Sequence, residues 1–480
     1  MKMTLSDKRA KNMAQVLRGP HASHCLLAPM LLSVTCIASL GQAVSTTSSE
    51  VAADHRPTME LTLPKALELA SKHNRHLLLA GLATKEAEEK RNIVRSEYFP
   101  HVRNESTALY LTALEGVVIP AGGLAHSPGT GLIPPAPIEI DQGQRDTFTS
   151  GTGLIQPLTQ LLTVRAGVRA ATADVEIAKL TAKDNENSIA LLVHKLYFGI
   201  LIRQLQFDAA QASIQTGAIL EEESEQSVTA GSALELAKLQ SHAALLYLKQ
   251  ASLTNELAIA DLTMQLDDVL GLSLGTRLKL DPDSLGEASA LPSAEDAMTA
   301  LKRHNPKILS AQQDVEKARA GITAARDAYI PNISGLARYS YQSGIPFLEH
   351  NFGTFGGSVT YDLYDGGARG AKLKTAKVQF HAAELELAQT EADLSIQMAA
   401  LYDELRRLEQ SVEVAAEALT VKQEAARISE QRMRENAALA SENARNHAEA
   451  IVAQASLLEA RLDLRLVQDQ VCQLLGQPPQ

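Results

Sequence analysis

The spacing of hydrophobic residues along the chain changes abruptly at two places, from a period of about 3.6 residues to a period of two. The first change follows the segment RSEYFPHVRN at Arg95–Asn104, and the second follows RDAYIPNISG at Arg326–Gly335. Proline disfavours the helical conformation in the residue before it, so each Tyr-x-Pro ends a helix. The pattern predicts helices over about 63–97 and 294–328, each followed by strands.

The residues after each Tyr-x-Pro alternate between apolar and polar side chains, which is typical of strands. The predicted strands of the first half cover about 98–112 and 145–158, and those of the second half about 331–343 and 352–364. The connection at 116–142 is rich in Gly and Pro and far longer than a hairpin needs. We therefore expect an exposed loop there.

Helical periodicity returns after each strand pair and continues without proline over about 161–270 and 368–475. A single helix of this size would be longer than about 150 Å, so each stretch is predicted to be two helices folded back at a turn. The predicted turns lie at Gly231 and Asn436. One continuous coiled coil in each stretch is the alternative. After the N-terminal segment, no stretch is expected to be apolar for long enough to cross a membrane as a helix.

The two halves of the chain are copies of one another. The matching residues form two groups. Within each group, every residue of the first half precedes its match in the second half by the same number of positions. Chance resemblance between Ala- and Glu-rich helices does not explain such a constant spacing. The matching residues are His73–Asn74 and His304–Asn305, Tyr98 and Tyr329, Pro100 and Pro331, and Leu270–Gly271 and Leu475–Gly476. The duplication predicts two structural repeats, at 61–290 and 291–480.

The N-terminus is predicted to be a secretory signal peptide, residues 1–43, followed by an extension at 44–60. Basic residues precede an apolar run at Cys25–Leu40, and the triplet Gly41-Gln42-Ala43 suits cleavage. A membrane anchor is the alternative, although the run is short for a spanning helix. Lipidation at Cys36 is disfavoured, because the residues before it match a lipoprotein cleavage box only loosely.

Composition narrows the function classes. Trp is absent and aromatic residues make up 4% of the chain, which favours long helices packed side by side over a compact globule. The formal net charge of −11 argues against nucleic acid as a partner. We find no metal-binding spacing of His or Cys, no phosphate-binding loop and no Ser/His/Asp arrangement. The chain is therefore expected to hold no metal or cofactor and not to be an enzyme.

The alternating strands leave two structural readings open. A strand with one apolar and one polar face suits a transmembrane barrel, but also a strand pair that packs on a soluble helical bundle. Four strands do not close a barrel, and open edges are not tolerated in lipid. The membrane reading thus requires several chains to share one barrel.

The order of elements, together with YDLYDGGARGAKLKTAKVQF at Tyr361–Phe380 and AGSALELAKLQ at Ala230–Gln240, resembles the TolC-type outer-membrane efflux proteins over about Leu61–Gly476. The resemblance implies a mainly α fold with a small β part. Three chains would form a trimeric α-helical barrel in the periplasm, continuous with a shared twelve-stranded transmembrane β-barrel. The helices would then enter the outer membrane at Tyr98 and Pro100 and at Tyr329 and Pro331.

The resemblance also implies a function: a passive exit channel of a tripartite efflux or type I secretion-like system. The expected partners are two further copies of the chain, a periplasmic adaptor, an inner-membrane transporter and outer-membrane lipid. The family closes its periplasmic tip with acidic side chains, for which Glu235 and, less clearly, Glu442 are the candidates. An ordinary solvated glutamate is the alternative for Glu235. For the whole chain, the alternative is a periplasmic coiled-coil scaffold or adaptor without a barrel.

Overall fold

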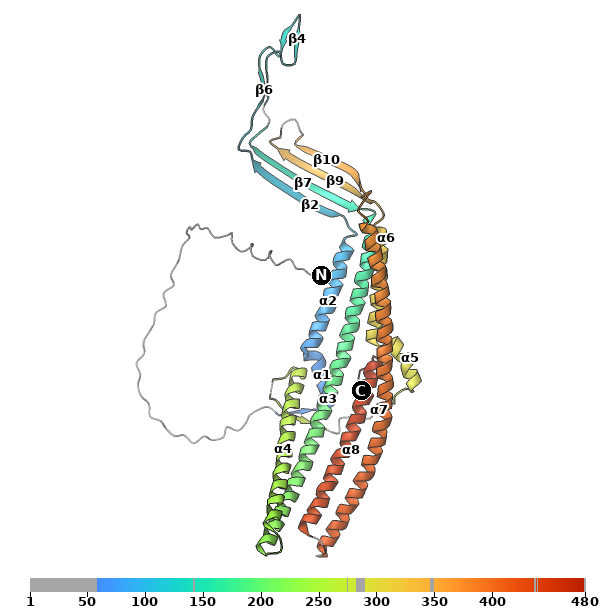
Figure 1. The fold of residues 1–480 in the computed structure, drawn as a ribbon. Coiled ribbons are helices and arrows are strands. Elements are labelled where there is room, and N and C mark those ends of the chain that lie inside the picture. The colour runs from blue at the N-terminus through green and yellow to red at the C-terminus, as the bar shows by residue number, and fades with distance from the viewer. Residues whose placement is uncertain are drawn as a thin grey trace, which may run out of the picture. The chain divides into compact units, whose positions relative to one another are not determined.

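The computed structural model describes residues 58–140, 143–273, 275–281, 290–345, 349–435, 437 and 439–478. The predicted signal peptide, Cys36, all of the extension before Thr58 and the predicted turn residue Asn436 lie outside these residues. The described chain is mainly helical, with a four-stranded sheet beyond one end of the helices (Figure 1).

The order of elements repeats along the chain. The helices of the first half are α1 (Leu63–His73), α2 (Arg75–Ser96), α3 (Gln160–Thr229) and α4 (Glu235–Leu270). Those of the second half are α5 (Ala294–His304), α6 (Pro306–Asp327), α7 (Ala368–Arg434) and α8 (Ala440–Leu474). The predicted fold of each long stretch into two helices is therefore present, and the continuous coiled coil is wrong.

The prediction of one unbroken helix before each Tyr-x-Pro is also wrong, because an asparagine divides each helix. Asn74 and Asn305 leave the helical conformation, with ψ of 123° at both residues. The side-chain oxygen of each asparagine accepts hydrogen bonds from the first backbone N–H groups of the following helix, at His76 and Leu77 and at Lys307 and Ile308. Each asparagine is thus an N-cap, which satisfies backbone donors that a helix start leaves unpaired.

The four long strands join into one antiparallel sheet. They are β2 (His101–Tyr110), β7 (Asp146–Pro157), β9 (Asn332–Ser343) and β10 (Asn351–Thr360), in the order β10-β9-β7-β2. The central pairing of β7 with β9 joins the two halves of the chain. The outermost strands β10 and β2 each leave one edge without a partner within the described chain.

The long connection between β2 and β7 is not a plain loop. It contains two antiparallel ribbons, β3 (Val117–Ile119) with β6 (Ile138–Ile140), and β4 (Ala125–Ser127) with β5 (Gly131–Ile133). The predicted exposure holds for most of its residues, but the prediction of a loop missed these three-residue strands. In Figure 1 the ribbons extend beyond the sheet, on the side away from the helices.

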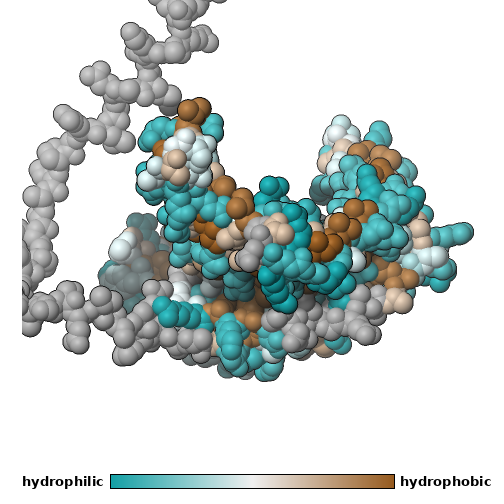
Figure 2. Space-filling model, turned by 90° about the horizontal axis from the view of Figure 1, so that it is seen from below, coloured by the Kyte–Doolittle hydropathy of each residue, from teal (hydrophilic) through white to brown (hydrophobic). Residues whose placement is uncertain are grey.

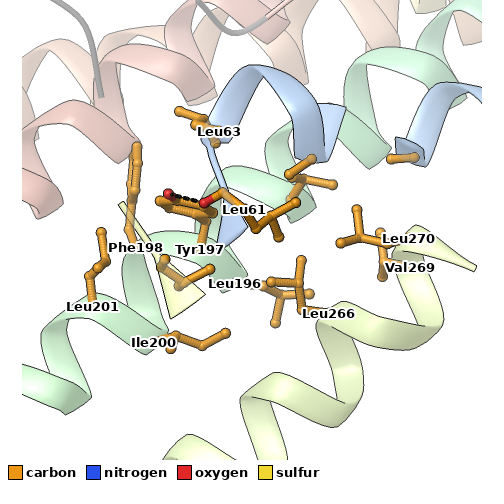
Figure 3. Packing of buried hydrophobic residues seen from close by; sticks show 14 of the residues in the cluster. Leu61, Leu63, Leu196, Tyr197, Phe198, Ile200, Leu201, Leu266, Val269 and Leu270 are labelled. Atoms are coloured by element: carbon orange, nitrogen blue, oxygen red, sulfur yellow. Dashed lines mark hydrogen bonds between the residues drawn. The ribbon is translucent and has the colours of Figure 1, made fainter. Parts of the chain in front are cut away.

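A hydrophobic core surrounds the middle of α3. It includes residues of a strand pair that the sequence did not suggest. There β1 (Thr58–Leu61) pairs in parallel with β8 (Arg277–Leu280). The Tyr197 hydroxyl donates a hydrogen bond to the Leu61 carbonyl, 2.9 Å away, so the buried phenol ties α3 to β1 (Figure 3). The buried members of this core are Leu61, Leu63, Ala66, Ala70, Val193, Leu196, Tyr197, Phe198, Ile200, Leu201, Leu266, Val269, Leu270, Leu280 and Leu462.

This core accounts for the apolar part of α3. The sequence was expected to contain no further stretch that is apolar for long enough to cross a membrane as a helix. That expectation is wrong, because α3 is long enough and contains a sufficiently apolar stretch, judged by length and composition only. Residues Val193–Leu201 of α3, however, pack against α1, α4 and Leu462 of α8. A smaller core holds α5 and α6 against α7 and α8, with Leu301, Ile308 and Met398 fully buried. Seen from below, hydrophobic residues form several separate groups on a surface that is hydrophilic over much of its area (Figure 2).

Each repeat is locked at the point where its asparagine divides the helix. Asn74 Nδ2 donates to the Val269 carbonyl at 2.9 Å, and Asn305 Nδ2 donates to the Leu474 carbonyl at 2.8 Å. The glycine that follows, Gly271 or Gly476, is left-handed, with φ of 71° or 73°. The duplicated His-Asn and Leu-Gly pairs of the sequence therefore meet in space, and we call each such contact an Asn/Gly lock.

Candidate functional site

The residues predicted to form the membrane entry, the helical turns and the aperture lie at the two ends of the long helices. One end carries the junctions between helices and sheet, and the other carries the turns α3/α4 and α7/α8 (Figure 1). The sheet itself presents two faces of different chemistry.

The two Tyr-x-Pro segments have the same geometry. After α2, the Tyr98 amide donates to the Arg95 carbonyl at 3.2 Å, and after α6 the Tyr329 amide donates to Arg326 at 3.1 Å. Strands begin one residue after Pro100 and one residue after Pro331. The structure thus places all four predicted residues at the step from helix to strand.

The return from strand to helix differs between the repeats. Between β7 and α3, the Thr159 hydroxyl donates to the Pro331 carbonyl at 2.7 Å and accepts from the Ile333 amide at 2.8 Å. Between β10 and α7, the Asp365 carboxylate accepts from the Gly367 and Arg369 amides, both at 2.9 Å. A hydroxyl holds the first junction, and a charged group holds the second.

Arg369 is the centre of the second junction, although no sequence signal marked it beyond its place in the DGGAR segment. Its Nε lies 2.8 Å from Asp365 Oδ2, and its guanidinium lies over the rings of Tyr361 and Tyr329, at 4.8 Å and 5.8 Å from their centres. Hydrogen bonds from the Arg369 amide and guanidinium lower the pKa of Asp365 to about 2. The Asp365 carboxylate thus pairs with backbone amides at the start of α7, and the two glycines that follow it, both at positive φ, turn the chain.

The sheet has one face that carries almost no charge. Residues paired across antiparallel strands lie on the same face, so the register assigns each position. We call this the uncharged face; its only acidic or basic residue is Asp146, at the start of β7. Its large residues are Val102, Tyr110, Phe148, Leu154, Ile333, Tyr339, Tyr341, Phe355 and Val359.

Polar side chains on the uncharged face bond to one another. Asn104 Nδ2 donates to Thr152 Oγ1 at 2.9 Å, and the hydroxyls of Ser106 and Ser150 lie 2.9 Å apart. The remaining acidic and basic residues of the four strands lie on the opposite, charged face: His101, Arg103, Glu105 and Arg338. The register therefore gathers every charged residue of the four strands except Asp146 on one face of a single sheet.

The α3/α4 turn lies where the sequence predicted it. Gly231 adopts φ of 71°, which glycine tolerates, and the Ser232 amide donates to the Ser227 carbonyl at 2.9 Å. Glu235 is the first residue of α4 and is exposed. Its negative charge is favourable at a helix N-terminus, where the backbone amides carry partial positive charge.

The α7/α8 turn is held differently. Arg432 Nη1 lies 3.1 Å from Glu442 Oε1, and the same guanidinium donates to the Ala437 carbonyl at 3.2 Å. Glu442 is therefore paired within the chain. For Glu235, the described residues contain no ion pair. Of the two acidic residues predicted for the aperture, Glu235 is the one whose charge remains uncompensated by a direct contact.

Sequence reasoning missed the contact that joins the two tips. Glu223 Oε1, on α3, accepts a hydrogen bond from the Ser441 amide, 3.0 Å away. Ser441 is the second residue of α8, so Glu223 satisfies one of the free amides at this helix start. Glu221 lies 2.6 Å from His242 of α4.

A buried pair of titratable residues joins α3 to α8 away from both ends. His194 Nδ1 lies 2.6 Å from Asp469 Oδ2, and both side chains are buried. The pair connects the two repeats and faces neither tip nor sheet. In the described part of the chain, no group of three His, Cys, Asp or Glu side chains could hold a metal ion.

Comparison with known proteins agrees with this arrangement. The family model described as outer membrane efflux protein matches residues 298–477. The solved open-state outer membrane channel MtrE of Neisseria gonorrhoeae is 17% identical, with 87% of this chain and 90% of that chain covered and a TM-score of 0.69. The outer membrane protein VceC of Vibrio cholerae is 16% identical, with 87% and 97% covered and a TM-score of 0.67. Comparison with curated proteins gives no match.

These similarities bear on four predictions. The resemblance to TolC-type outer-membrane efflux proteins is confirmed, together with the mainly helical fold that such channels share. The family match also confirms an outer-membrane location with a large periplasmic helical part, and the class of transport protein as opposed to enzyme.

Proposed function

We propose that this chain is the passive outer-membrane exit channel of a tripartite export system, and that three copies form it. The observation that carries the proposal is the sheet: four strands, two edges without partners among the described residues, and one face almost free of charge. The match of residues 298–477 to outer membrane efflux proteins supports the same function.

The strands have the length that a membrane barrel requires. They contain 10 or 12 residues each, and a tilted strand crosses the hydrocarbon layer with about 9 to 11. In lipid every backbone amide and carbonyl needs a partner, so the edges of β10 and β2 must be paired. Pairing β2 of one copy with β10 of the next closes a barrel of twelve strands. The uncharged face would then contact lipid and the charged face would line the lumen.

Aromatic residues lie at both ends of the strands, as membrane interfaces favour. Tyr110, Phe148 and Tyr341 lie at the end away from the helices, where the last two rings are 6.1 Å apart. Tyr361 and Tyr364 follow β10 at the helical end, and Tyr364 is 89% exposed. The two bands would place the sheet across the outer membrane, with the long helices in the periplasm.

The helical tips are the proposed contact for a periplasmic adaptor, which would connect the channel to an energised inner-membrane transporter. The sequence contains no phosphate-binding loop, so the channel itself would be passive. Three copies of Glu235 around the axis would form a carboxylate ring at the aperture that favours cations.

The first test is the native mass of the detergent-extracted protein, taken from outer membranes separated on a density gradient. We expect a trimer in the outer-membrane fraction. A monomer in the soluble periplasm would overturn the proposal and favour a soluble coiled-coil scaffold, whose strand pairs pack on helices.

A matched pair of substitutions sharpens this test. Ala337 and Leu336 are neighbours in β9 and lie on the uncharged and charged faces respectively. Arginine at a lipid-facing position near the bilayer centre costs about 2 to 4 kcal/mol, whereas a lumen position tolerates it. Ala337→Arg should therefore reduce the amount of trimer in the outer membrane, and Leu336→Arg should not. Equal amounts from both variants would contradict the assignment of the faces.

A further inference from the structure

Two arginines share one transverse row of the sheet. The register pairs Arg103 of β2 with Gly153 of β7, Gly153 with Arg338 of β9, and Arg338 with Thr354 of β10. Both arginines therefore project from the charged face at the same level along the strands. Only a glycine separates them within the row.

A glycine clears the space beside one of these arginines, Arg338. The Arg338 guanidinium lies over Gly151, where a β-carbon would be only 2.5 Å from Arg338 Nε. A residue with a side chain at that position would displace the guanidinium. Both arginines are exposed, and no carboxylate of the described chain lies within ion-pair distance of either.

We propose that Arg103 and Arg338 form an anion-binding zone in the lumen of the channel, which favours anionic cargo. This inference rests on the proposed trimeric barrel. Threefold symmetry would give two rings of three guanidinium groups. Strands lie about 4.8 Å apart and tilt by about 40°, so the rings would differ in height by roughly 6 Å.

The charge balance of the face supports binding of anions. The charged face of the four strands carries two arginines, Arg103 and Arg338, and one acidic side chain, Glu105. This positive excess contrasts with the formal net charge of −11 for the whole chain. Charge in a narrow lumen with low-dielectric walls is screened less than on an open surface, so it acts strongly on passing ions.

The guanidinium group also narrows the class of anion. Its planar N–H donors match the two oxygens of a carboxylate, sulfate or phosphate group, and such bidentate contacts are stronger than a contact to a point charge. Oxyanions and molecules that carry them should therefore bind in this zone better than chloride. Thr354, in the same row, adds a hydroxyl donor.

The test uses the purified full-length channel in planar lipid bilayers under a KCl gradient, with sulfate as the oxyanion probe. All channels carry Glu235→Gln, so that the proposed carboxylate ring does not contribute to selectivity. We expect Arg103→Gln/Arg338→Gln to lower the chloride-to-potassium permeability ratio several-fold. The sulfate concentration that halves the chloride current should rise about tenfold or more, as loss of a charge-assisted contact implies.

Two control variants separate charge from geometry. Arg103→Lys/Arg338→Lys keeps the charge and should keep the permeability ratio, but it should weaken the sulfate block. Arg427→Gln removes an exposed arginine of α7 that pairs with Glu424, and it should change neither measurement. A further variant combines Arg338→Cys with Cys472→Ala, so that the cysteine introduced at position 338 is the thiol to be modified. The same folded channel can then be labelled at this position with a positively or a negatively charged thiol reagent. Only the negative reagent should reverse the selectivity.

The outcomes distinguish this inference from the proposed function. If the channels conduct and neither the double Gln variant nor the thiol reagents change selectivity, the anion-binding zone is overturned while the exit channel stands. If the protein is a monomer that does not conduct, the proposed function fails, and the inference fails with it.

Discussion

The two repeats are nearly identical at their Asn/Gly locks and differ at their ends. Asn74 and Asn305 make the same three kinds of hydrogen bond with distances that agree within 0.1 Å. The ends differ. The strand-to-helix junction is held by the Thr159 hydroxyl in the first repeat and by the Asp365 carboxylate in the second. The helical turn uses a glycine at positive φ in the first repeat and is held by Arg432 in the second. Duplication thus kept the contacts that satisfy buried backbone groups. It left the two ends free to diverge.

The largest test of this comparison is a glycine substitution in each lock. A β-carbon at Gly476 would lie 2.3 Å from the His304 carbonyl oxygen, and one at Gly271 would lie 2.9 Å from the His73 Cβ. Both residues have positive φ, so alanine adds backbone strain as well. We expect Gly476→Ala to lower the free energy of unfolding by about 2 to 4 kcal/mol, and Gly271→Ala by somewhat less. Urea unfolding of the detergent-extracted protein measures both.

The control for these variants is Gly321→Ala in α6, where nothing lies within 4 Å of the added carbon and φ is not positive. That variant should be neutral or slightly stabilising, because alanine suits a helix interior better than glycine. If all three variants unfold alike, close packing at the locks is not what holds the repeats.

The second test removes the asparagines. Asn74→Ala and Asn305→Ala each delete an N-cap and leave the Val269 or Leu474 carbonyl without its donor. Loss of a cap costs about 1 kcal/mol, and an unpaired buried carbonyl adds about 1 to 2. We expect equal losses of about 2 to 3 kcal/mol in urea unfolding. Asn92→Ala, at an exposed position of α2, should change little, and a large difference between the two locks would contradict their equivalence.

The third test sharpens the difference between the two strand-to-helix junctions. The folded-state pKa of Asp365 is about 2, below the ordinary value near 4, so its stabilising effect is complete above about pH 4. This effect is lost as the pH falls through about 2. Protection of the amides of 367 and 369 against hydrogen exchange, corrected for intrinsic rates, should fall in that range. Amides near Thr159 should keep their protection.

Asp365→Asn provides the reference for this experiment. The variant should show lower protection at neutral pH and no further specific loss between pH 4 and 2. A parallel loss at the Thr159 junction in the unmodified protein would mean that acid loosens the whole sheet and not the charged junction.

The smallest effect is expected at the tips. Glu235→Gln removes a charge that forms no ion pair within the described residues, and should lower the preference of the channel for cations by a small factor in bilayer recordings. The double variant Arg432→Gln/Glu442→Gln removes a pair with no net charge, so selectivity should not change. Unchanged conductance and selectivity in Glu235→Gln would exclude Glu235 from the aperture.

The sequence predicted the elements whose signals are local. A change of hydrophobic period marked the Tyr98 and Tyr329 junctions, and a glycine in a polar segment marked the turn at Gly231. The break at Asn74 was missed because the helical pattern continues across it. The β1/β8 pair was missed because strands of four residues carry too little periodicity.

The candidate site could be predicted only in part, for a different reason. Glu223 acts on an amide 218 residues further along the chain, and Arg103 and Arg338 come together only through the pairing of β7 with β9. A local sequence pattern cannot reveal contacts between residues that are so far apart along the chain. Arg369 stood within a recognised segment, but its stacking on Tyr329 depends on the two halves meeting in one sheet.

The parallel pairing of β1 with β8 has a consequence for how such a chain could arise. It brings the start and the end of the first repeat side by side, so a second copy added in tandem begins at the level where the first one began. Duplication then needs only a short linker and no rearrangement of either copy. In the proposed trimer, six similar units would follow one another around the axis, so the assembly would approach sixfold pseudosymmetry although it contains only three chains.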